Sequence, residues 1–124
     1  MSFTEQEQRN NESAEKHLTA GLPFVADAEL TEKSSGTRIV ARLSEISLNG
    51  CYLAVLHGFP KGSEVFVKIF TRTDFFESAA IVTCYQPNLG VGLSFRDTSR
   101  HFKPTLQRWL LQVMKANYIS DDKS

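Results

Sequence analysis

"SEVFVKIFTRTDFFESAAIVTCYQPNLGVGLSF", residues 63–95, decides the fold class of this chain. The stretch contains three strand-like segments, which the short turn sequences RTD and PNLG separate. Val65, Val67 and Ile69 share one face of the first segment, because side chains in a strand alternate between its two faces. Strands that follow one another through short turns, with no helix between them, pair antiparallel. The stretch therefore predicts an antiparallel sheet.

Three more strands are predicted on the N-terminal side of this stretch. They are LPFVADAELTE (22–32), TRIVARLSEIS (37–47) and GCYLAVLH (50–57), and the loop sequence GFPKG (58–62) follows the last of them. In the first strand, apolar residues of period two form one face: Phe24, Ala26, Ala28 and Leu30. Six strands at regular intervals predict an all-β fold, either an antiparallel barrel or a sandwich.

The C-terminal end has the only convincing helical pattern. In PTLQRWLLQVMKANY, the apolar residues follow the spacing of one helix face: Leu106, Trp109, Leu110, Val113 and Met114. Pro104 suits the first turn, where a missing N–H costs nothing. We expect a helix over about 103–118 that covers one open end of the sheet, with a dimer or partner surface as the alternative. The domain then spans 22–118, between a flexible polar tail (1–21) and a disordered tail (119–124).

Composition limits the classes of function. The 124 residues include 14 basic and 14 acidic side chains, so the chain lacks the basic excess of a DNA- or RNA-binding protein. An OB-like barrel gripping single-stranded nucleic acid is the remaining alternative of that class. The chain has neither a membrane-spanning apolar run nor a secretory signal, which predicts a cytoplasmic protein without membrane insertion. Its two cysteines, Cys51 and Cys84, are then free thiols in strands rather than metal ligands.

Catalysis is not expected. The three histidines, His17, His57 and His101, are scattered, and none has a serine or cysteine at a recognisable motif spacing. No glycine-rich phosphate loop precedes a helix. We therefore expect a protein that is not an enzyme and has no metal and no cofactor.

The hexapeptide EISLNG, residues 45–50, holds the candidate binding residues. Alternation places Glu45 and Ser47 on one face, and Gly50 allows close approach of the backbone. Together they can accept hydrogen bonds from a guanine Watson–Crick edge and donate to a phosphate oxygen. Alternatively, Asn49-Gly50 is only a hairpin turn and the polar side chains are solvated.

The outward orientation of Glu45 requires an irregularity in its strand. Strict alternation from Glu45 would turn Arg38 and Arg42 inward, and unpaired arginines are almost never buried. We therefore predict a β-bulge between Arg42 and Glu45.

These residues resemble the PilZ domain family, the bacterial receptor module for cyclic di-GMP. That family has an acid or Asn, then Ser two residues on and Gly three further, and E-I-S-L-N-G is similar, with Glu45 where Asp or Asn is usual. The run LGVGLSF (89–95) resembles the family's entry into its last strand. The resemblance spans roughly 16–118. It implies a six-stranded antiparallel β-barrel closed by a C-terminal helix, and cyclic di-GMP as a ligand of Glu45, Ser47, Asn49 and Gly50.

The family's second motif, R-x-x-x-R ahead of the first strand, is where this chain departs. RIVAR (38–42) has the spacing but lies inside the second strand, so we assign its arginines to a solvated strand face. The expected place falls near Lys16 and His17, and Arg9 is the arginine of the N-terminal tail. These three residues complete the predicted cyclic di-GMP site.

Two functions remain open at this stage. The first is a module, monomeric or weakly dimeric, that binds cyclic di-GMP and relays this to an unidentified protein partner. The second is a degenerate adaptor that has lost the ligand and acts by protein contact in pilus, motility or biofilm machinery, as the resemblance implies. Its surface would include exposed aromatic residues, for which the candidates are Phe66, Phe70, Phe75, Phe76 and Tyr52.

Overall fold

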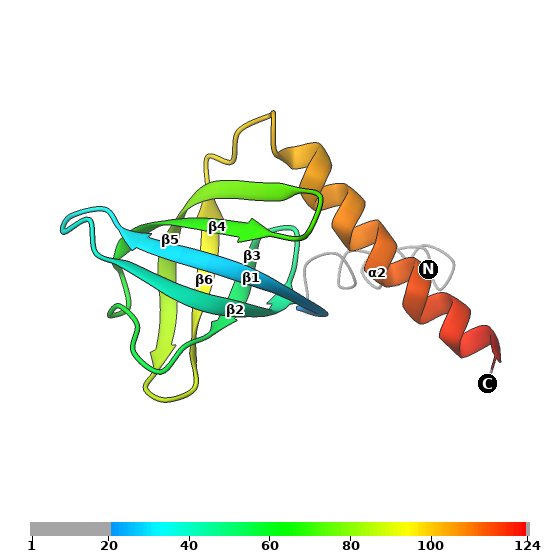
Figure 1. Cartoon of the computed structure of the whole chain (residues 1–124), viewed down its shortest axis with the longest axis horizontal. Coiled ribbons are helices and arrows are strands. Elements are labelled where there is room, and N and C mark those ends of the chain that lie inside the picture. The colour runs from blue at the N-terminus through cyan, green and yellow to red at the C-terminus, as the bar shows by residue number, and fades with distance from the viewer. Residues whose placement is uncertain (1–20, 124) are drawn as a thin grey trace, which may run out of the picture.

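A computed structural model describes residues 21–123, with side chains as far as Ala116. Within this described part of the chain, six strands precede one helix (Figure 1). Their bounds are β1 Leu22–Glu32, β2 Arg38–Ile46, β3 Gly50–Ala54, β4 Glu64–Phe70, β5 Phe75–Gln86, β6 Gly90–Arg96 and α2 Lys103–Lys123.

The strands form a closed barrel in the order β1-β2-β3-β6-β5-β4, and every neighbouring pair is antiparallel. Closure of the ring comes from the pairing of β1 with β4. The pairing of β3 with β6 joins two strands that are distant in sequence. The barrel is therefore confirmed over the sandwich, and it leaves no strand edge of the sheet unpaired.

Alternation along the strands separates the core from the outer wall. Val65, Val67 and Ile69 are buried inside the barrel, whereas Phe66 is 51% exposed on the outside of the same strand. On β1 the predicted inner face is confirmed, since Ala26, Ala28 and Leu30 are buried and Phe24 is half-buried. The buried apolar side chains form one continuous core.

The predicted bulge lies in β2. The register of β2 against β3 shifts between Leu43 and Glu45, so Arg42 and Glu45 are both exposed while Leu43 and Ile46 are both buried. Arg42 lies 3.5 Å from Asp27 across the β1–β2 pair. Arg38 lies 3.9 Å from Glu29, and both arginine side chains are about two-thirds exposed. The assignment of the RIVAR arginines to a solvated face is thus confirmed.

The helix α2 covers one end of the barrel, as predicted (Figure 1). Leu106, Trp109 and Leu110 are buried, and the Trp109 ring packs against Phe24 with ring centroids 5.3 Å apart. The helix continues to Lys123, beyond its expected end near 118, so residues 119–123 are helical where a disordered tail was expected. Within residues 21–123, no helical segment combines the length and the apolar character that crossing a lipid bilayer requires.

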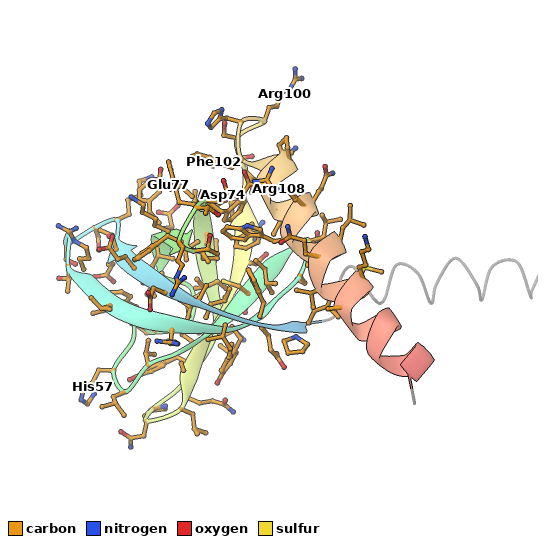
Figure 2. All side chains as sticks on the ribbon, turned by 45° about the vertical axis from the view of Figure 1, so that its right-hand side comes forward. His57, Asp74, Glu77, Arg100, Phe102 and Arg108 are labelled. Carbon is orange, nitrogen blue, oxygen red and sulfur yellow. The ribbon has the colours of Figure 1, made fainter. Side chains whose placement is uncertain are left out.

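An ion pair ties the helix to the barrel. Arg108 of α2 donates to the carboxylate of Asp74 in the β4–β5 turn at 2.7 Å, and the two residues lie together in Figure 2. His57 lies at the end of the barrel away from α2 in the same view, and it is exposed like His101. The surface assignment of these two histidines is confirmed.

Candidate functional site: a pocket on the outer wall

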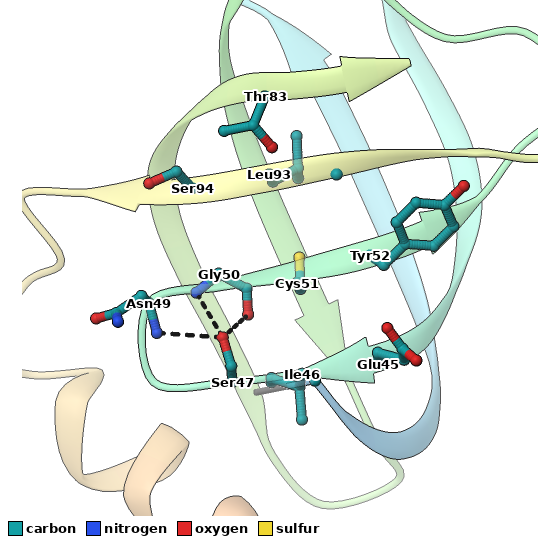
Figure 3. Close-up of a pocket in the computed structure, with 12 residues that line it drawn as sticks. Glu45, Ile46, Ser47, Asn49, Gly50, Cys51, Tyr52, Thr83, Leu93 and Ser94 are labelled. Carbon is teal, nitrogen blue, oxygen red and sulfur yellow. Dashed lines mark hydrogen bonds between the residues drawn. The ribbon is translucent and has the colours of Figure 1, made fainter. Parts of the chain in front are cut away.

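The hexapeptide 45–50 borders a depression of about 310 Å³ on the outside of the barrel (Figure 3). Its lining comes from β2, the β2–β3 turn, β3, β5 and β6, together with Gly21 at the start of the described chain. The lining residues are Gly21, Glu45, Ile46, Ser47, Asn49, Gly50, Cys51, Tyr52, Thr83, Gly92, Leu93 and Ser94. The structure therefore brings together the four predicted hexapeptide residues at one pocket.

The prediction that Ser47 shares the outward face of Glu45 is wrong. The strand β2 ends at Ile46, alternation stops there, and Ser47 is only 8% exposed. Its Oγ accepts hydrogen bonds from the backbone N–H groups of Gly50 (3.1 Å) and Asn49 (3.3 Å) and donates to the Gly50 carbonyl oxygen (3.1 Å). A hydroxyl has one proton and two lone pairs, so the turn uses the full bonding capacity of this group.

Gly50 is required by the barrel itself. A Cβ atom at this position would overlap the Leu93 carbonyl oxygen of β6, the strand with which Gly50 pairs through Ser94. The sequence suggested that Gly50 lets the backbone approach another molecule closely. In the structure the close neighbour is strand β6.

Glu45 and Asn49 are the two hexapeptide residues whose side chains remain available. Both are exposed, and within residues 21–116 neither side chain forms a hydrogen bond or an ion pair. The Glu45 carboxylate lies against the backbone of Gly21, where an added Cβ would stand 2.7 Å from Oε2. The chain ahead of β1 therefore enters the described structure directly beside Glu45.

Four further residues line the pocket that the sequence pattern had not assigned to the site: Tyr52, Thr83, Gly92 and Ser94. Gly92 and Ser94 belong to the LGVGLSF run, and Tyr52 is two residues beyond Gly50 on the same strand face. Period two along β3 was the available signal for Tyr52. Thr83 faces outward next to the buried Val82, as alternation along β5 places it, and the β5–β6 register shift between Val82 and Cys84 leaves Cys84 exposed as well.

The described part of the pocket carries one charge, the carboxylate of Glu45. Lys16, His17 and Arg9 lie outside the described residues.

Burial raises the pKa of the Cys51 thiol, which therefore remains neutral in the wall beneath the pocket. Cys84 is an exposed thiol on β5. Among residues 21–123, no three His, Cys, Asp or Glu side chains gather as metal ligands would.

Comparison with known proteins identifies the family. The PilZ domain model matches residues 6–112, a span that includes the segment with Arg9, Lys16 and His17. No curated protein matches the chain.

Two solved structures share the fold. The PilZ domain of CeSA from a cellulose-synthesizing bacterium has a TM-score of 0.60 at 9% identity, with 77% of this chain and 99% of that chain covered. The PilZ domain of Escherichia coli YcgR, solved with cyclic di-GMP, also has a TM-score of 0.60, at 15% identity, covering 84% and 94%. With the family model matching most of the sequence, the chain belongs to the PilZ domain family.

Proposed function

We propose that this PilZ domain binds cyclic di-GMP in the pocket beside Glu45 and relays the binding to a protein partner in the cytoplasm. PilZ domains are non-enzymatic receptor modules that take cyclic di-GMP as a ligand rather than as a cofactor. The observation that supports the proposal most directly is the Glu45 carboxylate, which has no hydrogen-bond or ion-pair partner among residues 21–116. It lies on the pocket rim while the neighbouring Ser47 hydroxyl is committed to the turn.

Glu45 suits a guanine base. An ionised carboxylate is an acceptor-only group with two oxygens, and the Watson–Crick edge of guanine presents two adjacent donors, N1–H and the N2 amino group. Two parallel charge-assisted hydrogen bonds follow from this match. Asn49 adds an exposed amide with both a donor and an acceptor at the other side of the pocket (Figure 3). In this arrangement Ser47 and Gly50 shape the turn beneath the ligand.

The ligand's two phosphates need positive charge, which the described lining does not supply because its one charge is negative. The segment before Gly21 can supply it. A fully extended chain covers at most about 3.6 Å per residue. The backbones of His17 and Lys16, four and five residues before Gly21, can therefore be at most roughly 14–18 Å from Gly21 at the pocket rim. We therefore assign Lys16 and His17 to the phosphates, with Arg9 as the more distant cation of the same segment.

A second depression supports a route for the relay. It has about 320 Å³ and lies between the β2–β3 turn and α2, lined by Leu48, Asn49, Thr98, Lys103, Leu106 and Gln107. Asn49 lines both this depression and the ligand pocket. A ligand that repositions Asn49 therefore acts on the surface where the turn faces the helix.

Calorimetric titration of the full-length chain with cyclic di-GMP tests the proposal. We expect saturable binding in the wild type, at least ten-fold weaker binding in Glu45→Gln, and unchanged binding in the charge-matched control Glu64→Gln, which is outside the pocket lining. Absence of heat up to about 100 μM ligand would refute the proposal.

A second titration separates the role of the N-terminal segment. We expect Lys16→Ala/His17→Ala to lose most of the affinity, because no described lining residue can replace the lost positive charge. The control is Lys33→Ala, which removes an exposed lysine from the β1–β2 turn. Equal binding by both variants would exclude Lys16 and His17 from the site.

The ligand-free adaptor remains a second candidate because of one observation. Phe66 and Phe75 are 51% and 45% exposed on the outside of β4 and β5. Of the other aromatic candidates, Phe70 is half-buried, Tyr52 lines the ligand pocket, and Phe76 is fully buried, so Phe76 is removed from this surface. If the chain binds no cyclic di-GMP, we expect affinity capture with wild-type protein to retain a partner that Phe66→Ser/Phe75→Ser loses. An inert monomer in light scattering and capture would contradict the adaptor.

A further inference from the structure

Tyr52 lies in the outer wall of the barrel in an arrangement that the hexapeptide does not explain. On β3 it pairs with Glu45 of β2 on one side and with Gly92 of β6 on the other. Its ring leans over β6, because a Cβ atom at Gly90 would stand 2.5 Å from the ring carbon Cε1. The ring is half-buried and lines the pocket (Figure 3).

Two glycines provide the surface on which the ring rests. A side chain at Gly90 would collide with the Tyr52 ring, and one at Gly92 would approach both that ring and Cys84 Sγ. Since β6 has no side chain at either position, the ring can lie across the strand.

A hydrogen bond fixes the outer end of the ring. The Tyr52 hydroxyl donates to Gln86 Oε1 at 2.8 Å, and Gln86 is the last residue of β5. The ring is thus held from both sides, by glycines beneath and by Gln86 at its tip. A tyrosine fixed in this way loses little conformational freedom when a ligand binds to it.

We propose that Tyr52 is a stacking subsite for a planar purine base, and that Gln86 is its positioning residue. The inference rests on the proposed ligand and specifies which part of the ligand the subsite holds. Purine faces stack on aromatic rings whatever their substituents, so the subsite takes a base without choosing between guanine and adenine. The choice falls to Glu45, the direct cross-strand neighbour of Tyr52. The aromatic ring that would stack on the base and the carboxylate that would accept its hydrogen bonds therefore come from paired residues on adjacent strands.

A purely structural role for Tyr52 predicts a different outcome. If the ring only covers β6 and bonds Gln86, its replacement would change stability and leave affinity unaltered. As a stacking platform, the ring contributes to affinity in proportion to its aromatic face. The variants Tyr52→Leu and Tyr52→Phe separate the two roles, because the first removes the aromatic face and the second removes only the hydroxyl.

The test is a titration of full-length wild type, Tyr52→Phe, Tyr52→Leu and Gln86→Ala with cyclic di-GMP. We expect affinity to fall about ten-fold or more in Tyr52→Leu and a few-fold in Tyr52→Phe and Gln86→Ala. Wild-type affinity in Tyr52→Leu would overturn the subsite while leaving the proposed ligand intact. No binding by the wild type would overturn the ligand and the subsite together.

Proton NMR of the wild-type complex provides a readout that needs no variant. A base stacked on Tyr52 has its H8 proton in the shielding region of the ring, so we expect this signal to move upfield on binding. Should Tyr52→Leu fail to fold, as thermal melting would show, this shift still decides the matter. Binding without an upfield H8 shift would refute the stacking subsite.

Discussion

The outer wall of this barrel has two contrasting sides. Around the pocket, the lining from β3 and β6 includes two buried glycines and a half-buried hydroxyl, Gly50, Gly92 and Ser94, and Glu45 carries the one carboxylate of the described lining. Across β1, β4 and β5, the outward positions hold phenylalanines and charges that are already paired with one another. Lys68 lies 3.8 Å from Glu77 and 5.0 Å from the ring centroid of Phe75.

The difference concerns which groups are left without a partner. On the phenylalanine side, opposite charges satisfy each other and apolar rings are exposed, a composition suited to another protein surface. On the pocket side, the backbone is close packed and Glu45 has no cationic neighbour among residues 21–116. One barrel thus presents an anion-bearing pocket and a self-neutralised apolar face on different parts of its outer wall.

Among the substitutions that test this difference between the two sides, Gly50→Ala has the largest expected effect on stability. The added methyl group would overlap the Leu93 carbonyl oxygen, so β3 and β6 must separate, and we expect a loss of about 3 kcal/mol or more in the free energy of unfolding. Urea denaturation measures it. The control Gly36→Ala has open space and a φ of +73°, so it costs only about 1–2 kcal/mol. Equal losses of unfolding free energy in Gly50→Ala and Gly36→Ala would show that the wall at Gly50 is no more closely packed than the exposed turn at Gly36.

Ser47→Ala comes next, at about 1–3 kcal/mol of unfolding free energy. The substitution leaves the Gly50 N–H without its side-chain acceptor in a buried turn. Ser94→Ala is the matched control, because the half-buried Ser94 hydroxyl has no hydrogen-bond partner within residues 21–116, and we expect it to change stability by less than about 0.5 kcal/mol. A stable Ser47→Ala protein would contradict the structural role of this hydroxyl.

On the opposite side, Arg108→Gln removes the 2.7 Å ion pair with Asp74, whose partners are each roughly half exposed. We expect a loss of about 0.5–1 kcal/mol that shrinks in 1 M salt, because salt screens exposed charges. Arg42→Gln, whose pair with Asp27 is longer and more exposed, should lose less. A loss that salt does not reduce would mean that packing of the Arg108 stem, rather than charge, holds the helix.

Phe66→Ala has the smallest expected effect on stability, about 0.5 kcal/mol or less, because half of its side chain is already in water. Phe76→Ala on the inside of the neighbouring strand should cost about 3–5 kcal/mol. Thermal and urea denaturation compare the two. A large loss in Phe66→Ala would mean that this ring serves the fold and is not free for a partner.

Local periodicity predicted the antiparallel strands and the covering helix, and the cost of burying Arg38 and Arg42 predicted the β2 bulge. The choice of a barrel over a sandwich came from the resemblance to the PilZ family. Periodicity missed the inward turn of Ser47, since alternation was extended one residue beyond the end of β2 at Ile46. The place of Tyr52 depends on β3 pairing with β6, a contact between residues forty positions apart. Periodicity has no information about such pairing.

Gly21 lies against Glu45, so the residues directly before Gly21 are joined to the pocket rim by only a few peptide bonds. Residues joined to the rim by a few peptide bonds meet the site at an effective concentration in the millimolar range, whatever the concentration of the protein. A separate peptide of residues 1–20, added to a shortened chain, would have to be supplied at about that concentration to restore the same contact. Under the proposed function, covalent attachment at the pocket's edge would therefore let weakly binding cations contribute to the binding of the ligand.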